Sequence, residues 1–237
     1  MQRHNRERLK EASVDFDVSV LELKADVCSR QDSLFMRKNA PSLYRHIFLA
    51  FKEESNGRDH YHALFVLLAV VLLELANEEV VVDLMRLELA VSNQEELSVF
   101  NRCGIQAVCA AFMRLLCELG PPPALRLYVA QVIENRRSRA SCLLPEFVFC
   151  DSPRVPEAQL QVESCCLFVQ SELSEALTGS SYGAHGDRLN CAYTPQVTDE
   201  DRISRRKVSE TDLTADGPEP GDQTGLSTET SDGADHI

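Results

Sequence analysis

Three carboxylates close together are the first residues in this sequence whose types and spacing could do chemistry. Glu78, Glu79 and Asp83 lie within one six-residue stretch, and paired acids of this kind can act as general acid and general base. The first two also follow Asn77, a residue type that caps helices, at a place where the helix dipole favours negative charge. We therefore expect a helix N-terminus here and no catalytic residue.

Histidine and cysteine are the residue types that most often bind metals or act as nucleophiles. His60 and His62 are two positions apart, whereas metal ligands on one helix face need a spacing of three or four. His46 lies between Arg45 and Ile47 with no nucleophile near it in the sequence, so we expect it to pack or to cap. The nine cysteines are an odd number, and none forms a C-x-x-C pair. We expect reduced cysteines packed as small hydrophobes, with no metal and no cofactor.

Two pairs of side chains are candidates for modification. Cys165 and Cys166 could be S-acylated, as cysteines near a membrane can be, but both fall on an apolar stripe that favours core packing. Ser204 and Ser209 lie in and just after the run at 202–207, in which four of six residues are Lys or Arg. This composition is typical of basophilic kinase sites, and a phosphate beside the neighbouring acidic residues would switch partner contacts electrostatically. A solvated linker with no role is the alternative.

The element that must position most of these residues is a strongly apolar stretch at 59–119. Eleven apolar residues in a row occupy 63–73. That is fewer than the ~20 that a membrane span needs, and it suits a helix buried on every side. The next segment repeats its apolar residues with the 3.6-residue period of a helix, at Val80, Leu84, Leu87 and Val91. This order predicts a helical hairpin.

Glycine and proline divide the rest of the chain into further helices. Gly120 and the three prolines after it predict the end of one helix, and another then runs to about 137. Residues 157–177 have the clearest amphipathic pattern, and Gly179 ends it. We expect about seven helices of roughly 14 to 25 residues, lengths close to those of HEAT and armadillo units. No strict internal repeat is visible, so the pattern alone leaves open both a solenoid and a compact bundle.

The predicted fold class is all-α, a HEAT/armadillo-like helical repeat. We expect a frayed N-terminus at 1–13, the helical repeat domain at 14–178, an extended linker with the basic run at 179–207 and a disordered acidic tail at 208–237. The tail is rich in Ser, Thr, Gly and Asp. It has too few apolar groups to repay its ordering entropy.

Charge and length limit the function classes. The 237 residues are 44% hydrophobic and carry a net charge of −13, which allows a sizeable core. From 208 onward there are eight acidic residues and no Lys or Arg, which leaves 29 acidic and 24 basic residues, a net charge of −5, before that point. An acidic body argues against nucleic acid as the main ligand. No apolar core follows the first ten residues, MQRHNRERLK, so we expect no signal peptide, and we expect no transmembrane segment.

Five segments resemble one protein family in their order and spacing. They are RQDSLFMRKN at 30–39, LYRHIFL at 43–49, LANEEVVVDLMRL at 75–87, FNRCGIQAV at 100–108 and PQVTDEDRISRRK at 195–207. Together they resemble the C-terminal part of the Rolling blackout family, also called eighty-five-requiring three, over about 28–207. The resemblance implies the C-terminal part of an α-solenoid of HEAT/armadillo-like repeats.

The same resemblance implies a scaffold and not an enzyme. The family sits on the cytosolic face of the plasma membrane and recruits the type III alpha phosphatidylinositol 4-kinase through a tetratricopeptide-repeat adaptor and its companion, hyccin. The kinase makes phosphatidylinositol 4-phosphate, so the implied role is to localise a protein to the plasma membrane. Membrane attachment is implied through an acylated cysteine cluster and a basic patch in upstream sequence that this chain lacks. On its own, this chain is expected in the cytosol.

The resemblance also points to a candidate partner-binding segment. It consists of Pro195, Gln196, Val197, Asp199, Arg202, Arg205 and Arg206. The tail after it does not resemble the family's C-terminal segment, which is implicated in adaptor binding. The alternative to a membrane scaffold is a soluble helical binding module, or a competitor fragment, which binds a partner away from the membrane.

Overall fold

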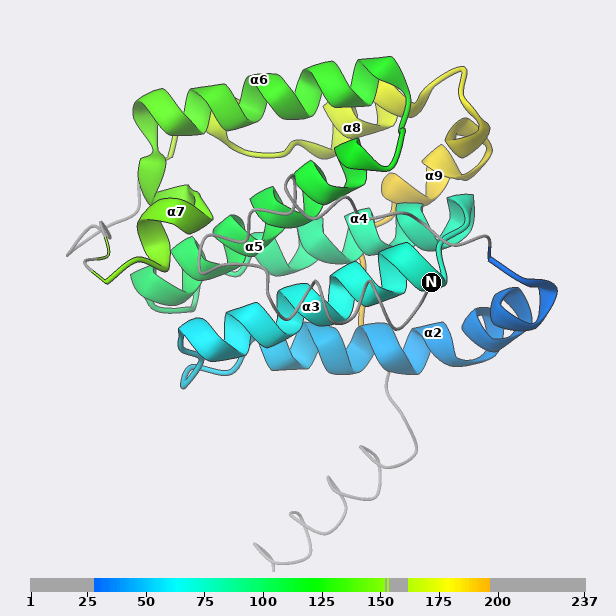
Figure 1. Ribbon diagram of the computed structural model, residues 1–237, viewed down its shortest axis with the longest axis horizontal. Helices are drawn as coiled ribbons and strands as arrows, with labels where there is room; N and C mark the ends of the chain where they lie inside the picture. Colours follow the sequence, from blue (N-terminus) through cyan, green and yellow to red (C-terminus); the bar gives the residue numbers. More distant parts are fainter. Residues whose placement is uncertain (1–27, 152, 154–161, 197–237) are drawn as a thin grey trace, which may run out of the picture. The chain divides into compact units, whose positions relative to one another are not determined.

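Helices joined by short turns make up the part of the chain that the computed structural model describes, residues 28–151, 153 and 162–196 (Figure 1). The long helices of this part are α2 (Arg30–Phe51), α3 (Arg58–Glu74), α4 (Glu78–Ser92), α5 (Val99–Glu118) and α6 (Pro123–Arg139). The shorter elements are η2 (Ser141–Leu143), α7 (Pro145–Val148), η3 (Ser164–Cys166), α8 (Gln170–Leu177), η4 (Ser181–His185) and α9 (Gly186–Leu189). None of the described residues lies in a β-strand. The segments predicted as a frayed start, 1–13, and an acidic tail, 208–237, lie outside them.

Each long helix packs against helices close to it in the chain. α2 contacts α3 and α4, both α3 and α4 contact α5, and α5 contacts α6, which in turn contacts α8. Figure 1 shows α2 and α3 side by side, α4 and α5 next to them, and α6 and α8 beyond. Among the described helices, α5 alone is long and apolar enough by length and composition to cross a membrane. However, 78% of its most apolar 18-residue window is buried in this packing, as in the core helix of a folded domain.

The helix boundaries around α4 and α5 follow the predicted signals. Asn77 caps α4, because its side chain accepts a hydrogen bond from the backbone N–H of Val80 at 3.0 Å. The apolar stripe predicted for this helix is buried, at Val80, Leu84, Leu87 and Val91. Gly120 ends α5 in the left-handed conformation, with a φ of 83°. Pro123 then begins α6, where a missing N–H costs nothing.

Helices α3 and α5 approach each other closely at a glycine. The ring of Tyr61 is fully buried against Gly104, and a Cβ atom at position 104 would lie 2.6 Å from Cε2 of that ring. The hydroxyl group of Tyr61 donates to the backbone carbonyl of Asn101 at 3.3 Å. Glycine at this position therefore leaves room for the aromatic ring and sets the spacing of the two helices.

A buried arginine joins α6 to the elements around it. Arg136 is 0% exposed, and its guanidinium donates to the backbone carbonyls of Gln106 and Cys166 at 2.7 Å each and to that of Leu143 at 3.2 Å. It also donates to Oε1 of Gln106 at 2.6 Å and lies 4.8 Å from the ring centroid of Phe168. Burial lowers the pKa of Arg136 to about 10, so the group stays charged at neutral pH. The bonds to three separate backbone segments compensate for its desolvation.

Two sequence predictions about the C-terminal half are wrong. Within the described part of the long helix predicted at 157–177, the chain is α-helical only as α8 from Gln170, and Leu167 and Val169 just before it are extended, with ψ values of 147° and 131°. Residues 157–161 lie outside the described part of the chain. The linker predicted at 179–207 is not extended in its described part, because it contains η4 and α9, which both pack on α4. Leu189, 1% exposed, supplies the apolar contact that holds this segment on the core.

Candidate functional site

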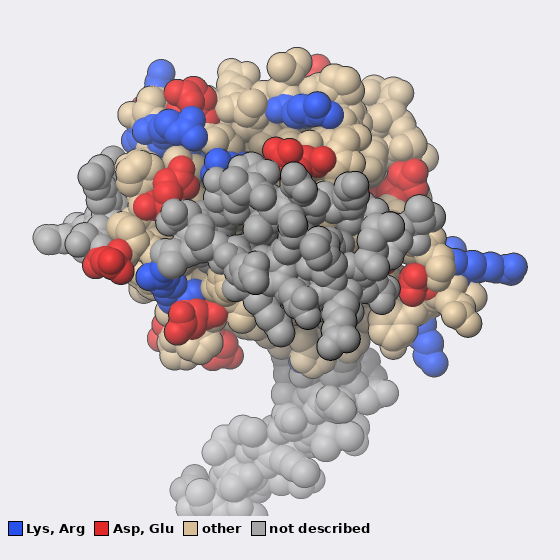
Figure 2. All heavy atoms as spheres, in the orientation of Figure 1, with Lys and Arg blue, Asp and Glu red and all other residues tan. Residues whose placement is uncertain are grey.

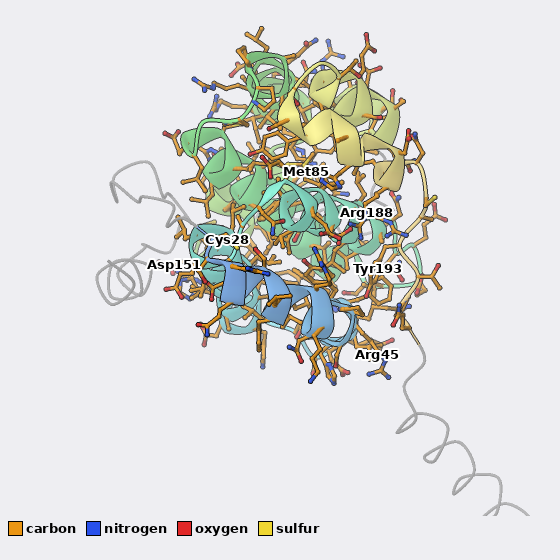
Figure 3. The ribbon with its side chains drawn as sticks, turned by 90° about the vertical axis from the view of Figure 1, so that its right-hand side faces the viewer. Cys28, Arg45, Met85, Asp151, Arg188 and Tyr193 are labelled. Carbon is orange, nitrogen blue, oxygen red and sulfur yellow. The ribbon has the colours of Figure 1, made fainter. Side chains whose placement is uncertain are left out.

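A cavity of about 220 Å³ lies between α2 and α4, and the residues after α9 line it as well. Part of its lining is apolar, from Met36, Ala40, Pro41 and Val80. The polar part comes from Ser33, Arg37, Tyr44, Asn77, Glu79, Asp83, Arg86, Arg188, Tyr193, Thr194 and Gln196. Figure 3 shows this side of the molecule, with Arg188 and Tyr193 labelled near each other. The cavity thus combines an apolar wall with several groups that can donate or accept hydrogen bonds.

Arg188 of α9 bridges two carboxylates of α4. Its Nη1 atom lies 2.6 Å from Oε1 of Glu79, and its Nη2 atom lies 3.0 Å from Oδ2 of Asp83. The two acids are four residues apart, so they share a face of the helix. Glu79 is 43% exposed and Asp83 is 14% exposed, so the bond to Asp83 is the better shielded of the two. These ion pairs hold α9 on α4.

Arg86, one turn further along α4, fixes the backbone that leaves α9. Its Nε atom donates to the carbonyl of Cys191 at 2.6 Å and its Nη2 atom to that of Ala192 at 2.9 Å. Its guanidinium carbon is 5.9 Å from the ring centroid of Tyr193, and that ring lies 5.6 Å from the ring of Phe48 on α2. Residues 191–193 are therefore tied to both helices that border the cavity.

Three polar atoms at the cavity have no hydrogen-bond partner in the described structure. They are the hydroxyl groups of Tyr44 and Tyr193 and the Oδ1 atom of Asp83. Tyr44 is only 4% exposed. Burial, with a smaller contribution from Asp83, holds its pKa far above the ordinary value, so it keeps its proton and can donate. Burial also raises the pKa of Asp83, against the opposing effect of Arg188 and Arg86.

The cavity brings together four of the five segments on which the family resemblance rests. Residues 30–39 supply Met36, residues 43–49 supply Tyr44, and residues 75–87 supply both acids and Arg86. Gln196 comes from the segment at 195–207. Segments far apart in the sequence therefore meet around one site.

The predicted helix-start acids have two different environments. Glu78 is exposed, whereas Glu79 and Asp83 pair with Arg188. The sequence analysis singled out Glu79 and Asp83 as neighbouring acids, but it did not find Arg188 as their partner. It also missed Tyr44, whose position within an apolar helix face gave no sign of an unpaired hydroxyl group.

His60 and His46 both lie at the surface. His60 is exposed, and its Nδ1 atom accepts from the backbone N–H of Gly57 at 3.1 Å, so it caps the start of α3. His46 is exposed, and its Nδ1 atom lies 2.7 Å from the carbonyl of Ser42. Within residues 28–151 and 162–196, no group of three or more His, Cys, Asp or Glu side chains is arranged to hold a metal ion.

The adjacent cysteines point in different directions. Cys166 is 0% exposed, so S-acylation of this thiol, one of the two candidates, is not compatible with the folded structure. Cys165 is exposed, and its sulfur lies 3.6 Å from a carboxylate oxygen of Glu163 and 4.0 Å from Nη1 of Arg139. The prediction that both thiols pack in the core is therefore right for Cys166 and wrong for Cys165, because η3 interrupts the expected helix there.

Most of the candidate partner-binding segment lies outside the described residues. Pro195 is half-buried and Gln196 is exposed beside the cavity. The other members of the segment, and both candidate phosphorylation sites, lie beyond the last described position; they are Val197, Asp199, Arg202, Arg205, Arg206, Ser204 and Ser209.

Comparison with known proteins gives the family. The sequence profile described as "EFR3, armadillo repeat" matches residues 1–178, most of the chain. This chain belongs to the EFR3 family. The armadillo repeat of this family agrees with the all-α fold described above, in which each long helix packs against helices close to it in the sequence.

Curated EFR3 proteins from several animals are similar to this chain. It is 49% identical to Protein EFR3 homolog B of Homo sapiens over 216 residues, which cover 88% of this chain and 26% of the human protein. It is 42% identical to Protein EFR3 homolog A of Mus musculus over 213 residues, covering 87% and 26% of the two chains. The chain therefore spans about a quarter of the length of these relatives. No solved structure matches it.

Proposed function

We propose that this EFR3-family chain is a non-catalytic part of a plasma-membrane scaffold. In this proposal it helps to recruit the type III alpha phosphatidylinositol 4-kinase through a tetratricopeptide-repeat adaptor and a hyccin-type partner. The observation that carries the proposal is the family match over residues 1–178. The mechanism is positional, because a scaffold that holds a kinase beside its lipid raises the effective concentration of the enzyme without an active site of its own.

The described surface supports a binding role better than a catalytic one. Two arginines that line the cavity are used in structural contacts, Arg188 with two carboxylates and Arg86 with two carbonyls. On the face drawn in Figure 2, the basic and acidic side chains are interspersed, with no large patch of one sign among the described residues. Such a surface suits a specific protein contact more than broad attraction to a polyanion.

The contact with the adaptor is proposed to lie where the chain leaves α9. Residues 191–193 are fixed on α2 and α4, and the segment at 195–207 follows directly. The helical body therefore holds the described residues that precede this segment in one place. The basic side chains of Arg205 and Arg206 would then meet acidic groups of the adaptor.

A pull-down of the adaptor together with hyccin tests the proposal. Three forms are compared: the full chain, a chain ending at Gln196, and the full chain with Arg205→Glu and Arg206→Glu. Ending the chain at Gln196 keeps the contacts of Ala192 and Tyr193, which an earlier cut would remove. Arg139→Glu, at an exposed position of the helical body, is the matched charge control.

Binding by the full chain and by the control, with a large loss in the double variant, supports the proposed segment. Binding by all forms supports the scaffold function and moves the contact onto the helical body. If folded full-length chain captures neither protein, the adaptor-dependent function is wrong for this chain. Membrane fractionation of cells that express the chain then distinguishes a scaffold from a binding module that acts in the cytosol.

A further inference from the structure

Two large apolar side chains lie exposed next to each other near the start of α2. Leu34 and Phe35 are each 55% exposed, and α2 lies at one edge of the packed long helices (Figure 1). Single exposed apolar side chains are normal on a protein surface, whereas adjacent ones form a patch that a partner can cover. The other exposed large apolar side chains of the described structure have no exposed large apolar neighbour in the sequence; they are Leu49, Leu67, Leu127 and Val169.

Three basic side chains surround this apolar pair. Arg30 precedes Leu34 by four residues, and Arg37 and Lys38 follow it by three and four, so the helix places all three beside it. Lys38 also follows Phe35 by three residues and is therefore a neighbour of both apolar side chains. All three basic residues are exposed. We call these five residues the α2 face.

The positive charge of the α2 face is not neutralised within the described part of the chain. There, the side chains of Arg30, Arg37 and Lys38 have no ion-pair or hydrogen-bond partner. Asp32 is the one acidic residue of α2, and its carboxylate accepts from the backbone N–H of the helix cap at 3.1 Å. The α2 face therefore presents three positive charges that a partner can pair.

The acids of the neighbouring cavity leave this charge in place. Arg37 lines the α2–α4 cavity together with Glu79 and Asp83, but both of these carboxylates bond to Arg188. Arg86 also lines the cavity, so its charged residues are three arginines and two acids. The cavity thus adds to the positive charge beside the α2 face.

Helix α6 has similar exposed residues in a different arrangement. Leu127 is 73% exposed beside Arg126, but no second large apolar side chain is exposed next to it. Two further exposed arginines of this helix, Arg137 and Arg139, form ion pairs with glutamates. The surface of α6 is therefore less apolar and more neutral than the α2 face, and it provides matched control positions.

A partner for the α2 face needs apolar groups flanked by negative charge. An anionic membrane and an acidic peptide both meet this requirement, but the total charge favours the peptide. The chain carries a net charge of −13, so an anionic lipid surface repels the molecule as a whole. A peptide contact depends mainly on the charges close to it. An amphipathic helix with apolar residues three and four positions apart can cover two neighbouring side chains of α2.

We propose that the α2 face is a docking surface for an acidic amphipathic helix of a partner protein. The apolar stripe of that helix covers Leu34 and Phe35, and the Asp or Glu side chains beside the stripe pair with Arg30, Arg37 and Lys38. This inference goes beyond the proposed function, because it uses neither the adaptor nor the segment at 195–207. It adds a second contact surface on the helical body and the chemistry of the partner.

A display library of helical peptides, panned on the purified full chain, tests this surface. The enriched peptides are then measured against wild type, Phe35→Ala and the double variant Arg30→Glu with Lys38→Glu, which leaves the lining of the cavity unchanged. Leu127→Ala and Arg126→Glu make the corresponding changes at exposed positions of α6 and are the matched controls. Thermal unfolding of every variant establishes that the fold is kept.

We expect the enriched peptides to carry apolar residues three and four positions apart, with Asp or Glu on both sides. Phe35→Ala should weaken their binding about tenfold, as the loss of an aromatic anchor does. Arg30→Glu with Lys38→Glu should weaken it about tenfold at low salt and less at high salt, because salt screens exposed charges. Both α6 variants should bind as wild type does.

Three results with the peptides would overturn the docking surface: no enriched peptide, enriched peptides without acidic residues, or equal binding by wild type and both α2 variants. A fourth is binding of the chain to vesicles of equal parts phosphatidylcholine and phosphatidylserine that both α2 variants lose. The occupant would then be a lipid surface. The adaptor pull-down separates this inference from the proposed function. Adaptor capture with no enriched peptide refutes the α2 face alone, and enriched peptides without adaptor capture refute the adaptor contact alone.

Discussion

Glu88 is a buried group whose protonation makes the stability of this protein depend on pH. Its side chain is 1% exposed, and neither carboxyl oxygen has a hydrogen-bond partner. Burial raises its pKa to about 7, with a smaller opposing effect from the thiol of Cys109. The group is therefore protonated in the folded state at pH values at which the unfolded chain has already lost the proton.

The stability contribution of Glu88 is full below pH 4.5 and lost as pH rises to 7. Between these values the folded state binds one proton more than the unfolded state, so the free energy of unfolding falls with pH by roughly 3 kcal/mol in total. Glu88→Gln mimics the protonated form, and we expect it to remove most of this fall. Urea unfolding between pH 4.5 and 8 measures it. Exposed Glu95→Gln is the control, and an equal fall in wild type and Glu88→Gln would contradict the assignment.

A second prediction concerns Tyr44, because its hydroxyl group makes no hydrogen bond that a substitution could remove. We expect Tyr44→Phe to leave the free energy of unfolding unchanged or to raise it by up to about 1 kcal/mol. Tyr128→Phe should lower it by about 1 kcal/mol, because the Tyr128 hydroxyl accepts from the N–H of Val169 at 2.8 Å. Chemical denaturation compares the two. A clear loss of stability in Tyr44→Phe would mean that its hydroxyl is bonded in the free protein.

The contact between helices α3 and α5 depends on Gly104. Alanine is the better helix former, yet its Cβ atom would meet the Tyr61 ring at 2.6 Å. We expect Gly104→Ala to lower the free energy of unfolding by about 1–3 kcal/mol through overpacking. In Gly186→Ala of α9, the added Cβ atom would lie 3.9 Å from the hydroxyl oxygen of Ser174, an ordinary contact distance, so this variant should be tolerated. Thermal unfolding of both variants tests this difference, and equal melting temperatures would contradict the close contact.

The docking of α9 on α4 depends on Arg188. Its pair with Asp83 is partly shielded, but Arg188 is 38% exposed, so solvent screens the pair and Arg188→Met should cost about 1 kcal/mol. Arg139→Met, which breaks a more exposed pair with Glu163, should lower the stability less than Arg188→Met does. Hydrogen exchange should speed up at residues 186–193 in the Arg188 variant. Unchanged exchange there would show that Leu189 alone holds the segment.

The elements near the middle of the chain could be predicted because local rules and burial agree there. Asn77, the stripe from Val80 to Val91 and Gly120 all behave as their residue types predict. The end of the helical region could not be predicted from the sequence. The elements η4 and α9 are too short to show a helical period, and their positions depend on side chains of α4 that are distant in the sequence. The run of arginines at the end of α6 also does not reveal that Arg136 is buried, because its burial depends on contacts with other segments of the chain.

The candidate site was predictable in part. Glu79, Asp83 and Arg86 share a polar face that the helix period predicts. Their partners lie on residues 188–193, more than one hundred positions away, and no local pattern connects them. The hydroxyl group of Tyr44 is unpaired because the neighbouring elements place no hydrogen-bond partner beside it, and a single sequence does not show this.

At the scale of the whole molecule, the packed helices agree with the armadillo repeat of the EFR3 family, and the chain spans about a quarter of the length of its curated relatives. Arg188 and Arg86 beside the α2–α4 cavity are used in contacts inside the fold, and this cavity is small and partly polar. Both features suit a protein that binds other proteins. The proposed recruitment of a lipid kinase then belongs to the assembled scaffold and needs this part to hold the adaptor.

Recruitment in cells tests that proposal most directly. In cells lacking their own EFR3 proteins, human EFR3 homolog B would be expressed with its matching segment replaced by this chain, and kinase fluorescence at the plasma membrane would be measured. We expect the chimera to restore the membrane signal of the adaptor and the kinase to near the level of the intact human protein. A chimera that is folded and reaches the membrane but leaves both in the cytosol would contradict the proposed function.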